Sequence, residues 1–277
     1  MKQEFSKDYQ DSFNVLKNTI AFLRSKDGCP WDQKQTHNSL KKNLLEESYE
    51  LLDALESKDP QKIKEELGDL VCQVFFHCEI AEESGDFSIS DVFSVLNDKL
   101  IRRHPHVFGD SKALNPENAH AIWQESKRKE NPNKSFLDGV PNNMPELAKA
   151  QLFQERAGLQ GFDWDNIGDV IKKISEEFEE YSNSKTEEEK KEELGDLLFS
   201  IVNLARWVDI YAEDSLRTTN QKFYERFKLM EELAKKRNES LKEMSMDEKE
   251  RLWEEAKVRL YSKIQKSINP DHESGRK

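Results

Sequence analysis

The sequence predicts an all-α protein made of two similar helical bundles, and three observations lead to this fold class. Charged residues and hydrophobic residues each make up 35% of the chain, while glycine and proline are scarce, and this mixture is typical of long amphipathic helices. A series of short motifs also occurs twice along the chain. Finally, apolar residues recur at spacings of three and four, as one face of a helix requires: Leu67, Leu70, Val71, Val74 and Phe75.

The repeated motifs stand in the same order in both halves. GCPWD at residues 28–32 matches GFDWD at 161–165, EESYE at 46–50 matches EEFEE at 176–180, and EELGDL at 65–70 returns at 192–197. Further along each half, a Lys and an Arg four apart are followed by a Trp and a Lys four apart: Lys99, Arg103, Trp123 and Lys127, then Lys222, Arg226, Trp253 and Lys257. Chance can give one such pair, but an ordered series indicates an internal duplication.

A segment rich in Asn and Pro, from Lys129 to Leu147, separates the two halves. Its prolines at positions 132, 141 and 145 each interrupt a helix. We therefore expect one helical domain over residues 1–135 and a second over residues 136–277. Two helix starts are also marked in the sequence. Asp59 before Pro60 is typical of an N-cap followed by a first-turn proline, and residues 186–189, Thr-x-x-Glu, have the pattern of a capping box.

Each half carries four carboxylates at helical spacing. Two glutamates three residues apart share one helix face, and a glutamate and an aspartate three apart follow on the next helix. A short connection makes the two helices antiparallel neighbours, so all four groups can converge. The sets are Glu47, Glu50, Glu66 and Asp69 in the first half, and Glu177, Glu180, Glu193 and Asp196 in the second.

Four neighbouring carboxylates repel one another unless protons or a cation lie among them. Oxygen ligands suit hard divalent ions, so the pattern predicts Mg²⁺, with Mn²⁺ as a substitute, and metal-assisted chemistry on a polyphosphate. A single ExxE is more simply explained as the solvated face of an amphipathic helix. ExxE followed by ExxD, present twice at matching places, favours the metal site.

Phosphate binding is one interpretation of the cations near the end of the chain. Lys222 and Arg226 share a helix face, as do Trp253 and Lys257. Lysine and arginine bind phosphate through charge and directed donors, and a tryptophan beside them can pack against a base or a ribose. The alternative is a core tryptophan with surface ion pairs around it, and spacing alone favours that alternative.

Composition excludes several classes of function. The net charge of −12 argues against general nucleic-acid binding. No apolar run is long enough to span a bilayer and the first residues lack the apolar core of a leader, so we expect a cytoplasmic protein with no membrane partner. Three cysteines without a CxxC pair argue against a disulfide framework and a structural zinc site. Trp31 and Trp164 are expected to be core or loop anchors.

Taken together, the motifs resemble those of one family. GCPWD, EESYELLDAL, EELGDL, RRHPHVFGD, GFDWD and EELGDLLFSIVNLARW look like the motifs of the MazG family of nucleoside triphosphate pyrophosphohydrolases. The resemblance covers almost the whole chain and both repeats. It implies an all-α fold, usually as a homodimer, and Mg²⁺-dependent hydrolysis of bound NTPs or dNTPs, ATP included, to the monophosphate and pyrophosphate.

The resemblance also implies roles for individual residues, mainly in the C-terminal half, which is the active half in this family. The metal ligands and catalytic residues correspond to Glu177, Glu180, Glu193 and Asp196. The nucleotide contacts correspond to Lys173, Lys190 (with Lys191 as the alternative), Lys222, Arg226, Trp253 and Lys257. The N-terminal half keeps a candidate second metal site in Glu47, Glu50, Glu66 and Asp69, but it has Asn43 where the other half has Lys173.

Two other functions fit parts of the pattern. A non-catalytic protein that binds nucleotide or Mg²⁺ and regulates a partner would use the same ligands, and release of pyrophosphate separates it from an enzyme. A di-iron carboxylate bundle would need Glu-x-x-His pairs, which neither half has beside its acids.

Overall fold

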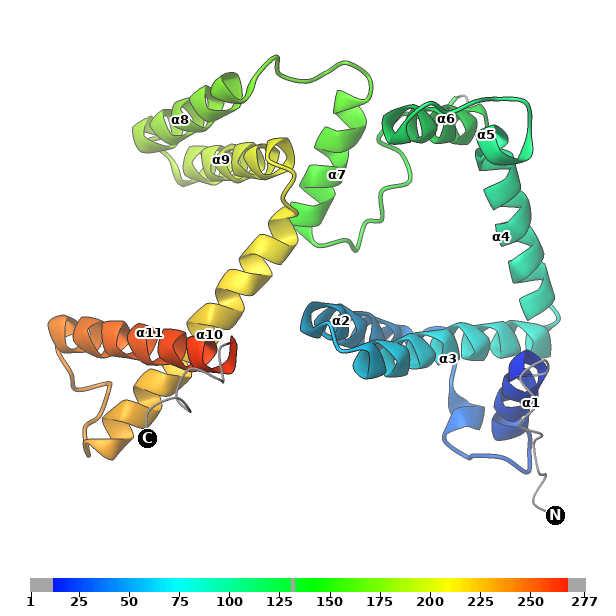
Figure 1. The fold of residues 1–277 in the computed structure, drawn as a ribbon, viewed down its shortest axis with the longest axis horizontal. Helices are drawn as coiled ribbons and strands as arrows, with labels where there is room; N and C mark the ends of the chain where they lie inside the picture. The colour runs from blue at the N-terminus through cyan, green and yellow to red at the C-terminus, as the bar shows by residue number, and fades with distance from the viewer. Residues whose placement is uncertain (1–11, 131–132, 269–277) are drawn as a thin grey trace, which may run out of the picture. The chain divides into compact units, whose positions relative to one another are not determined.

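Helices form all the regular secondary structure in the computed structural model, which describes residues 12–130 and 133–268, with side chains as far as Ser262 (Figure 1). Residues 1–11, where we expect no leader, and Pro132 of the linker lie outside the described residues. The chain divides into two compact units, the first unit being residues 1–132 and the second unit residues 133–277. The predicted all-α, duplicated fold is confirmed.

The two units contain the same order of long helices. The first unit has α1 (Ser12–Arg24), the short 3-10 helix η2 (Asp32–Lys34), α2 (Lys41–Ser57), α3 (Pro60–Ser84), α4 (Ile89–Arg103), α5 (Pro105–Phe108) and α6 (Pro116–Lys129). The second unit has α7 (Glu146–Gly158), α8 (Ile167–Asn183), α9 (Glu187–Trp207), α10 (Ala212–Lys236) and α11 (Met246–Ile268). By the repeated motifs, α2 and α3 correspond to α8 and α9, and α4 and α6 correspond to α10 and α11.

Local signals start two of these helices where the sequence predicts. At the start of α3, the side chain of Asp59 accepts a hydrogen bond from the backbone N–H of Gln61, with Pro60 in the first turn. At the start of α9, Thr186 and Glu189 form a reciprocal capping box. Each cap satisfies backbone N–H groups that have no partner inside the helix and stabilises the helix by about 1 kcal/mol. Both predicted starts are confirmed.

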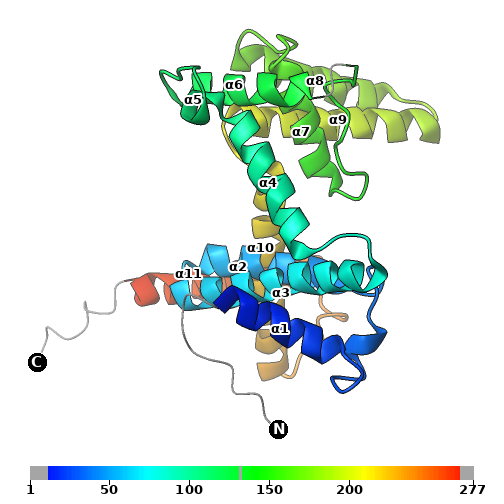
Figure 2. The same ribbon diagram turned by 90° about the vertical axis from the view of Figure 1, so that its right-hand side faces the viewer.

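In the first unit the core lies where α1 and α4 pack against α3, with α2 alongside α3 (Figures 1 and 2). The helix α4 then leads away from this core to α5 and α6. Large side chains fill the core, which consists of Ile20, Leu40, Phe75, Phe76, Cys78, Ile80 and Ile89. The α2–α3 hairpin, which carries the carboxylates of this unit, is therefore held by a well-filled core.

In the second unit α8 and α9 lie side by side, α7 packs against α9, and α10 leads from the end of α9 to α11 (Figure 1). The larger hydrophobic cluster lies between α10 and α11 and contains Leu229, Met230, Leu233, Ala234, Leu252 and Ala256. Around α7, α8 and α9 the buried hydrophobic side chains are small ones, Ala148, Val170 and Val202. The hairpin of α8 and α9 is therefore less completely filled than its counterpart in the first unit.

Trp31 and Trp164 are 57% and 42% exposed, so of the two expected positions, core or loop, both take the loop position. Both stand in the loops that precede the carboxylate hairpins. The three cysteines are free thiols, and Cys78 is buried. Among the described helices, none combines the length and the apolar character that crossing a membrane requires.

Candidate active site

The carboxylates of the second unit come together where α8 packs on α9. Glu177, Glu180 and Glu193 each place a carboxylate oxygen within 4.8 Å of the other two. Glu177 is only 5% exposed because it lies in the contact between the helices, whereas Glu180 is exposed. Asp196, one turn beyond Glu193, is outside this group of three but is close enough to affect its charge. The structure therefore brings three of the four predicted ligands together and places the fourth beside them.

The carboxylates of this cluster repel one another, so their charged forms are disfavoured where no metal ion is bound. Burial, and then the neighbouring charges of Glu180 and Asp196, raise the pKa of Glu193. A raised carboxylate pKa means that the charged form is unfavourable in that place. A set of oxygen ligands with surplus negative charge fits a hard divalent ion such as Mg²⁺.

Lys173 lies at the edge of this cluster, one turn before Glu177 on α8. Its Nζ is 2.7 Å from a carboxylate oxygen of Glu176 and 2.7 Å from one of Glu177. The hydrogen bonds to Glu176 and Glu177 raise the pKa of Lys173, so this lysine is charged at neutral pH. A permanent cation is thus fixed beside the carboxylates.

A cavity of about 540 Å³ opens next to these groups within the second unit. Lys173, Glu177 and Asp196 stand on its wall. The rest of the wall is largely apolar and aromatic, with Phe153, Phe162, Trp164, Val170 and Phe199. This volume lies within the range of about 300–1,000 Å³ that is usual for small-molecule sites. The site therefore combines a carboxylate cluster that can bind a metal ion with a largely apolar cavity.

Polar side chains in the same wall supply hydrogen-bonding groups. Gln154 of α7 is buried; its Nε2 donates to the backbone oxygen of Phe199 at 2.8 Å, while its Oε1 has no partner among the described residues. Arg206 donates two hydrogen bonds to Asp163, at 2.8 Å and 2.5 Å, and one from Nε to Asn203 at 3.0 Å. The bonds from Arg206 lower the pKa of Asp163, which keeps this pair ionised.

The first unit has a similar carboxylate group on α2 and α3. Glu47, Glu66 and Asp69 have oxygens within 4.8 Å of one another, and Glu50 is outside this group. Burial, followed by the charge of Asp69, raises the pKa of Glu47, and burial, followed by the charge of Glu50, raises that of Glu66. This cluster therefore has the same mutual repulsion, but the position of Lys173 is taken by the neutral Asn43.

The cations predicted to bind phosphate on α10 and α11 do not lie beside the carboxylates of the same chain. Lys222, Arg226 and Lys257 line a separate cavity of about 450 Å³ between these two helices. Figure 1 shows α11 at the end of α10 that is remote from α8 and α9. The guanidinium of Arg226 lies 5.6 Å from the ring centroid of Trp253, and Lys257 pairs with Glu254 at 2.8 Å.

Lys190 stands in the first turn of α9, three residues before Glu193. Its Nζ lies 3.3 Å from a carboxylate oxygen of Glu187, and both side chains are largely exposed. The ion pair recorded for Lys190 is therefore with the start of its own helix, not with the carboxylate cluster.

The sequence pattern did not reveal the cavity or the polar residues in its wall, such as Gln154, Asn203 and Arg206. A usable signal was present in the repeats. Counting from the matched motifs, Ala157 and Asn203 of the second unit stand where the first unit has Arg24 and Phe76. Two large side chains replaced by smaller ones at neighbouring helices indicate free space.

Fold and site together define a class: a duplicated all-α protein whose two helical hairpins each carry a carboxylate group that can hold a divalent metal ion. Comparison with known proteins identifies the family. Residues 35–108 and 166–243 match the MazG nucleotide pyrophosphohydrolase domain, and the chain belongs to the MazG family. Both matched segments include one of the two carboxylate hairpins.

Individual relatives are similar over most of the chain. The nucleoside triphosphate pyrophosphohydrolase/pyrophosphatase MazG of Thermotoga maritima is 46% identical over 247 residues, which cover 88% of this chain and 95% of that protein. The nucleoside triphosphate pyrophosphohydrolase of Escherichia coli K12 is 40% identical over 238 residues, covering 83% and 90%. The uncharacterized protein YabN of Bacillus subtilis is 43% identical over 251 residues, covering 88% of this chain and 51% of YabN.

Proposed function

We propose that the protein hydrolyses nucleoside triphosphates, NTPs or dNTPs, to the nucleoside monophosphate and pyrophosphate, and that residues 136–277 form its catalytic domain. The observation that carries the proposal is the second unit's cluster of Glu177, Glu180 and Glu193, with Lys173 at its edge and a cavity beside it. The similarity to relatives named as nucleoside triphosphate pyrophosphohydrolases supports the same reaction.

The carboxylates of the second unit are suited to hold Mg²⁺, or Mn²⁺ in its place. When bound there, the ion supplies Lewis-acid stabilisation of the charge on the substrate phosphates. Glu177, Glu180, Glu193 and Asp196 would be its ligands. A carboxylate that is not fully occupied as a ligand would accept the proton of the attacking water.

Lys173 and the cavity give the substrate its position. The ammonium group of Lys173 is 2.7 Å from Glu177, so a phosphate held at the carboxylate cluster lies within reach of this cation. A charge-assisted contact of this kind stabilises negative charge that builds up on the phosphates during hydrolysis. The apolar and aromatic wall of the neighbouring cavity accommodates the nucleoside.

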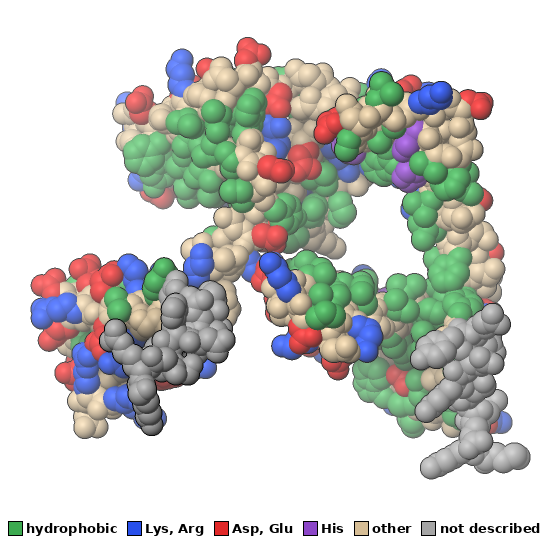
Figure 3. Space-filling model, in the orientation of Figure 1, with side chains coloured by type: hydrophobic (Ala, Val, Ile, Leu, Met, Phe, Trp, Pro, Cys, Tyr) green, Lys and Arg blue, Asp and Glu red, His purple; other side chains and the backbone are tan. Residues whose placement is uncertain are grey.

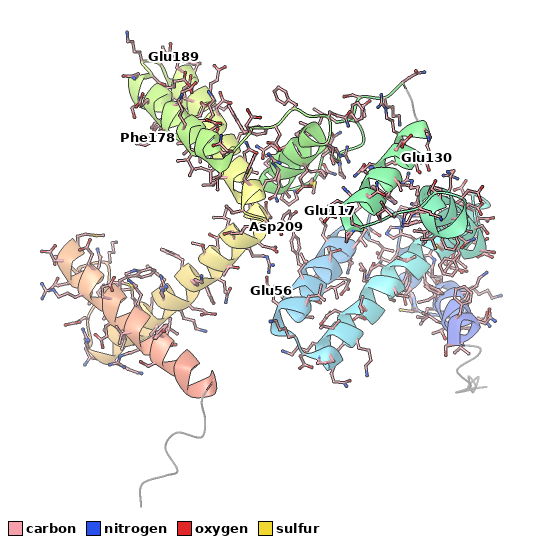
Figure 4. The ribbon with its side chains drawn as sticks, turned by 45° about the horizontal axis from the view of Figure 1, so that its top comes forward. Glu56, Glu117, Glu130, Phe178, Glu189 and Asp209 are labelled. Carbon is pink, nitrogen blue, oxygen red and sulfur yellow. The ribbon has the colours of Figure 1, made fainter. Side chains whose placement is uncertain are left out.

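We also propose that the active form is a cytoplasmic homodimer. Large apolar side chains on α8 and α9 are 45–59% exposed, among them Ile171, Phe178, Leu194 and Leu198. Figure 3 shows a hydrophobic surface over these two helices, and Figure 4 shows Phe178 pointing outward from α8. An apolar surface of this kind is typical of a protein interface. A second copy on this face would also bring another set of Lys222, Arg226, Trp253 and Lys257 to the assembly.

Sharing of the site between copies can be tested by complementation. A chain with Asp196→Ala and a chain with Arg226→Ala, each weakly active alone, are mixed and allowed to exchange subunits. Recovery of pyrophosphate release above the sum of the two supports a site built from both copies. If the purified protein stays monomeric at full activity, the dimer proposal is wrong.

The alternative is a protein that binds nucleotide and Mg²⁺ and regulates a partner without catalysis. The carboxylate cluster that can hold a metal, next to a cation and a cavity, favours the enzyme, since binding alone does not require a group placed to accept a proton from water.

A panel of NTPs and dNTPs with Mg²⁺, with products resolved by chromatography, tests the proposed reaction. We expect monophosphate and pyrophosphate, loss of activity with excess EDTA, and recovery with Mg²⁺ or Mn²⁺. Nucleotide binding without product would support the regulatory alternative, and diphosphate with phosphate as products would exclude the proposed reaction.

A further inference from the structure

The first unit contains an arginine fork that is already occupied by a carboxylate of its own chain. Glu130, the C-cap residue directly after α6, receives hydrogen bonds from Arg103 on α4, from Nε at 3.0 Å and from the terminal nitrogen Nη2 at 2.6 Å. Arg102 adds a third hydrogen bond, from its Nε at 2.9 Å. Figure 4 shows Glu130 at the end of α6.

This ion pair is sheltered and stays charged. The side chains of Arg103 and Glu130 are 17% and 16% exposed, whereas Arg102 is 55% exposed. The hydrogen bond from Arg103 lowers the pKa of Glu130 to about 2. The guanidinium of Arg103 also lies 5.5 Å from the ring centroid of Trp123, so tryptophan on one side and carboxylate on the other hold the arginine.

The second unit has the same arginine and tryptophan but no such carboxylate. Arg226 stands over Trp253 at 5.6 Å, almost as Arg103 stands over Trp123. The residue seven positions after the tryptophan is Glu130 in the first unit and Leu260 in the second. Among the described side chains, none forms an ion pair or hydrogen bond with Arg226, whose cavity of about 450 Å³ is open beside it.

We propose that Glu130 takes the place at Arg103 that a substrate phosphate takes at Arg226, and that this carboxylate makes the first unit a weak polyphosphate site. The inference rests on the proposed phosphate-binding role of Arg226. It identifies Glu130 as a residue that determines which of the two units accepts substrate, in addition to the difference between Asn43 and Lys173.

The two units differ because Glu130 occupies the guanidinium of Arg103, and not because of the net charge around each arginine. The first unit has Arg102 beside Arg103, while the second has Glu225 beside Arg226, so charge alone would favour phosphate binding in the first unit. Arginine binds carboxylate and phosphate with the same two parallel donors. A phosphate can therefore bind the Nε and Nη2 donors of Arg103 only by displacing Glu130, which removes that sheltered carboxylate from its main partner and is unfavourable.

One arm of the test introduces the carboxylate into the second unit. Leu260→Glu should raise the KM for NTPs by about tenfold or more, as expected for the loss of a charge-assisted hydrogen bond. The matched variant Leu260→Gln has the same size without the charge and should change KM much less. Equal effects of the two variants would mean that the shape of the α10–α11 contact matters and not the charge, which contradicts the proposal.

The other arm removes the carboxylate from the first unit and measures binding, so that it does not depend on catalysis. The background is the full chain with Lys222→Ala and Arg226→Ala, titrated with inorganic triphosphate in EDTA by calorimetry. Adding Glu130→Leu should tighten binding by about tenfold or more, and adding Arg103→Ala as well should abolish the gain. Glu130→Gln, which preserves the shape of the side chain, repeats the test if Glu130→Leu lowers the unfolding temperature.

The outcomes separate this inference from the proposed function. Unchanged triphosphate affinity in both Glu130 variants overturns the inference, whatever the enzyme activity. Failure of the unmodified chain to release pyrophosphate overturns the proposed function, while a gain of triphosphate binding through Arg103 would still support the role of Glu130.

Discussion

Arg24 at the end of α1 and Phe76 of α3 are buried in the first unit, whereas Ala157 and Asn203 stand at the corresponding places in the second unit. Arg24 is buried, and its guanidinium donates to the backbone oxygens of Asp32 at 2.6 Å and Gln35 at 3.2 Å and to the carboxylate of Glu83. The second unit has the cavity of about 540 Å³ in this region. One copy of the duplicated fold uses its interior for packing, and the other keeps it open.

The carboxylate pattern alone does not distinguish the two units. Each places three carboxylate oxygens within 4.8 Å. The differences lie around the clusters. The second unit has Lys173, an open cavity and an Arg226 that is not paired with a carboxylate of the described residues, whereas the first unit has Asn43, a filled interior and an Arg103 that is paired with Glu130. All three differences favour substrate binding in the second unit.

The largest expected effect comes from removing carboxylates unit by unit. Glu180→Ala with Asp196→Ala should abolish nearly all pyrophosphate release, because both changes remove proposed metal ligands. Removing a residue that only supports a metal ligand already lowers activity roughly 10–100-fold, and removing the ligands themselves should lower it more. Glu50→Ala with Asp69→Ala should keep most activity. Circular dichroism should show intact helices in both. The reverse result would assign catalysis to the first unit.

A smaller effect is expected from exchanging the residue beside the cluster. Lys173→Asn gives the second unit the residue of the first, and it removes a charge-assisted phosphate contact that contributes on the order of 1.5–3 kcal/mol. We expect kcat/KM to fall by roughly ten- to a hundredfold. Asn43→Lys is the matched change and should leave the rate of the full chain nearly unaltered. A full rate in Lys173→Asn would remove this lysine from the proposed site.

The filled interior of the first unit can be opened by Arg24→Ala. The backbone oxygens of Asp32 and Gln35 then lose their donor, and we expect the free energy of unfolding of this unit to fall by about 1–3 kcal/mol. Denaturant unfolding monitored by circular dichroism measures the change. Pyrophosphate release under native conditions should be unchanged, and a parallel loss of activity would show that the first unit takes part in catalysis.

The smallest effect concerns acid stability. The pKa of Glu130 is lowered from an ordinary value of 4.5 to about 2, so its ion pair stabilises the folded state fully above pH 4.5 and less as the pH falls towards 2. Glu130→Gln lacks this contribution. The difference in unfolding midpoint between the native chain and the variant should therefore shrink as the pH is lowered through this window. A constant difference would mean that Glu130 is not held as a charged partner of Arg103.

Much of the fold could be predicted because the interactions that specify it are local. A cap such as Thr186 with Glu189 acts within one helical turn, and the spacing of Leu67, Leu70 and Val71 marks one helix face. The carboxylates were also predictable as neighbours, because each pair is one turn apart and the two helices are joined by a short connection. The exposure of Trp164 could not be predicted, because a side chain in a loop has no periodic pattern that shows which way it points.

The helices, the duplication and the two carboxylate hairpins could be predicted from the amino-acid sequence, since each depends on residues close together in the chain or on motifs that recur. Tertiary packing places Lys222 and Arg226 in a cavity apart from the carboxylates, and it brings Glu130 into an ion pair with Arg103. It also decided that the space near Ala157 stays open. These features depend on side-chain volume and charge at positions far apart in the chain, which meet only when the helices pack.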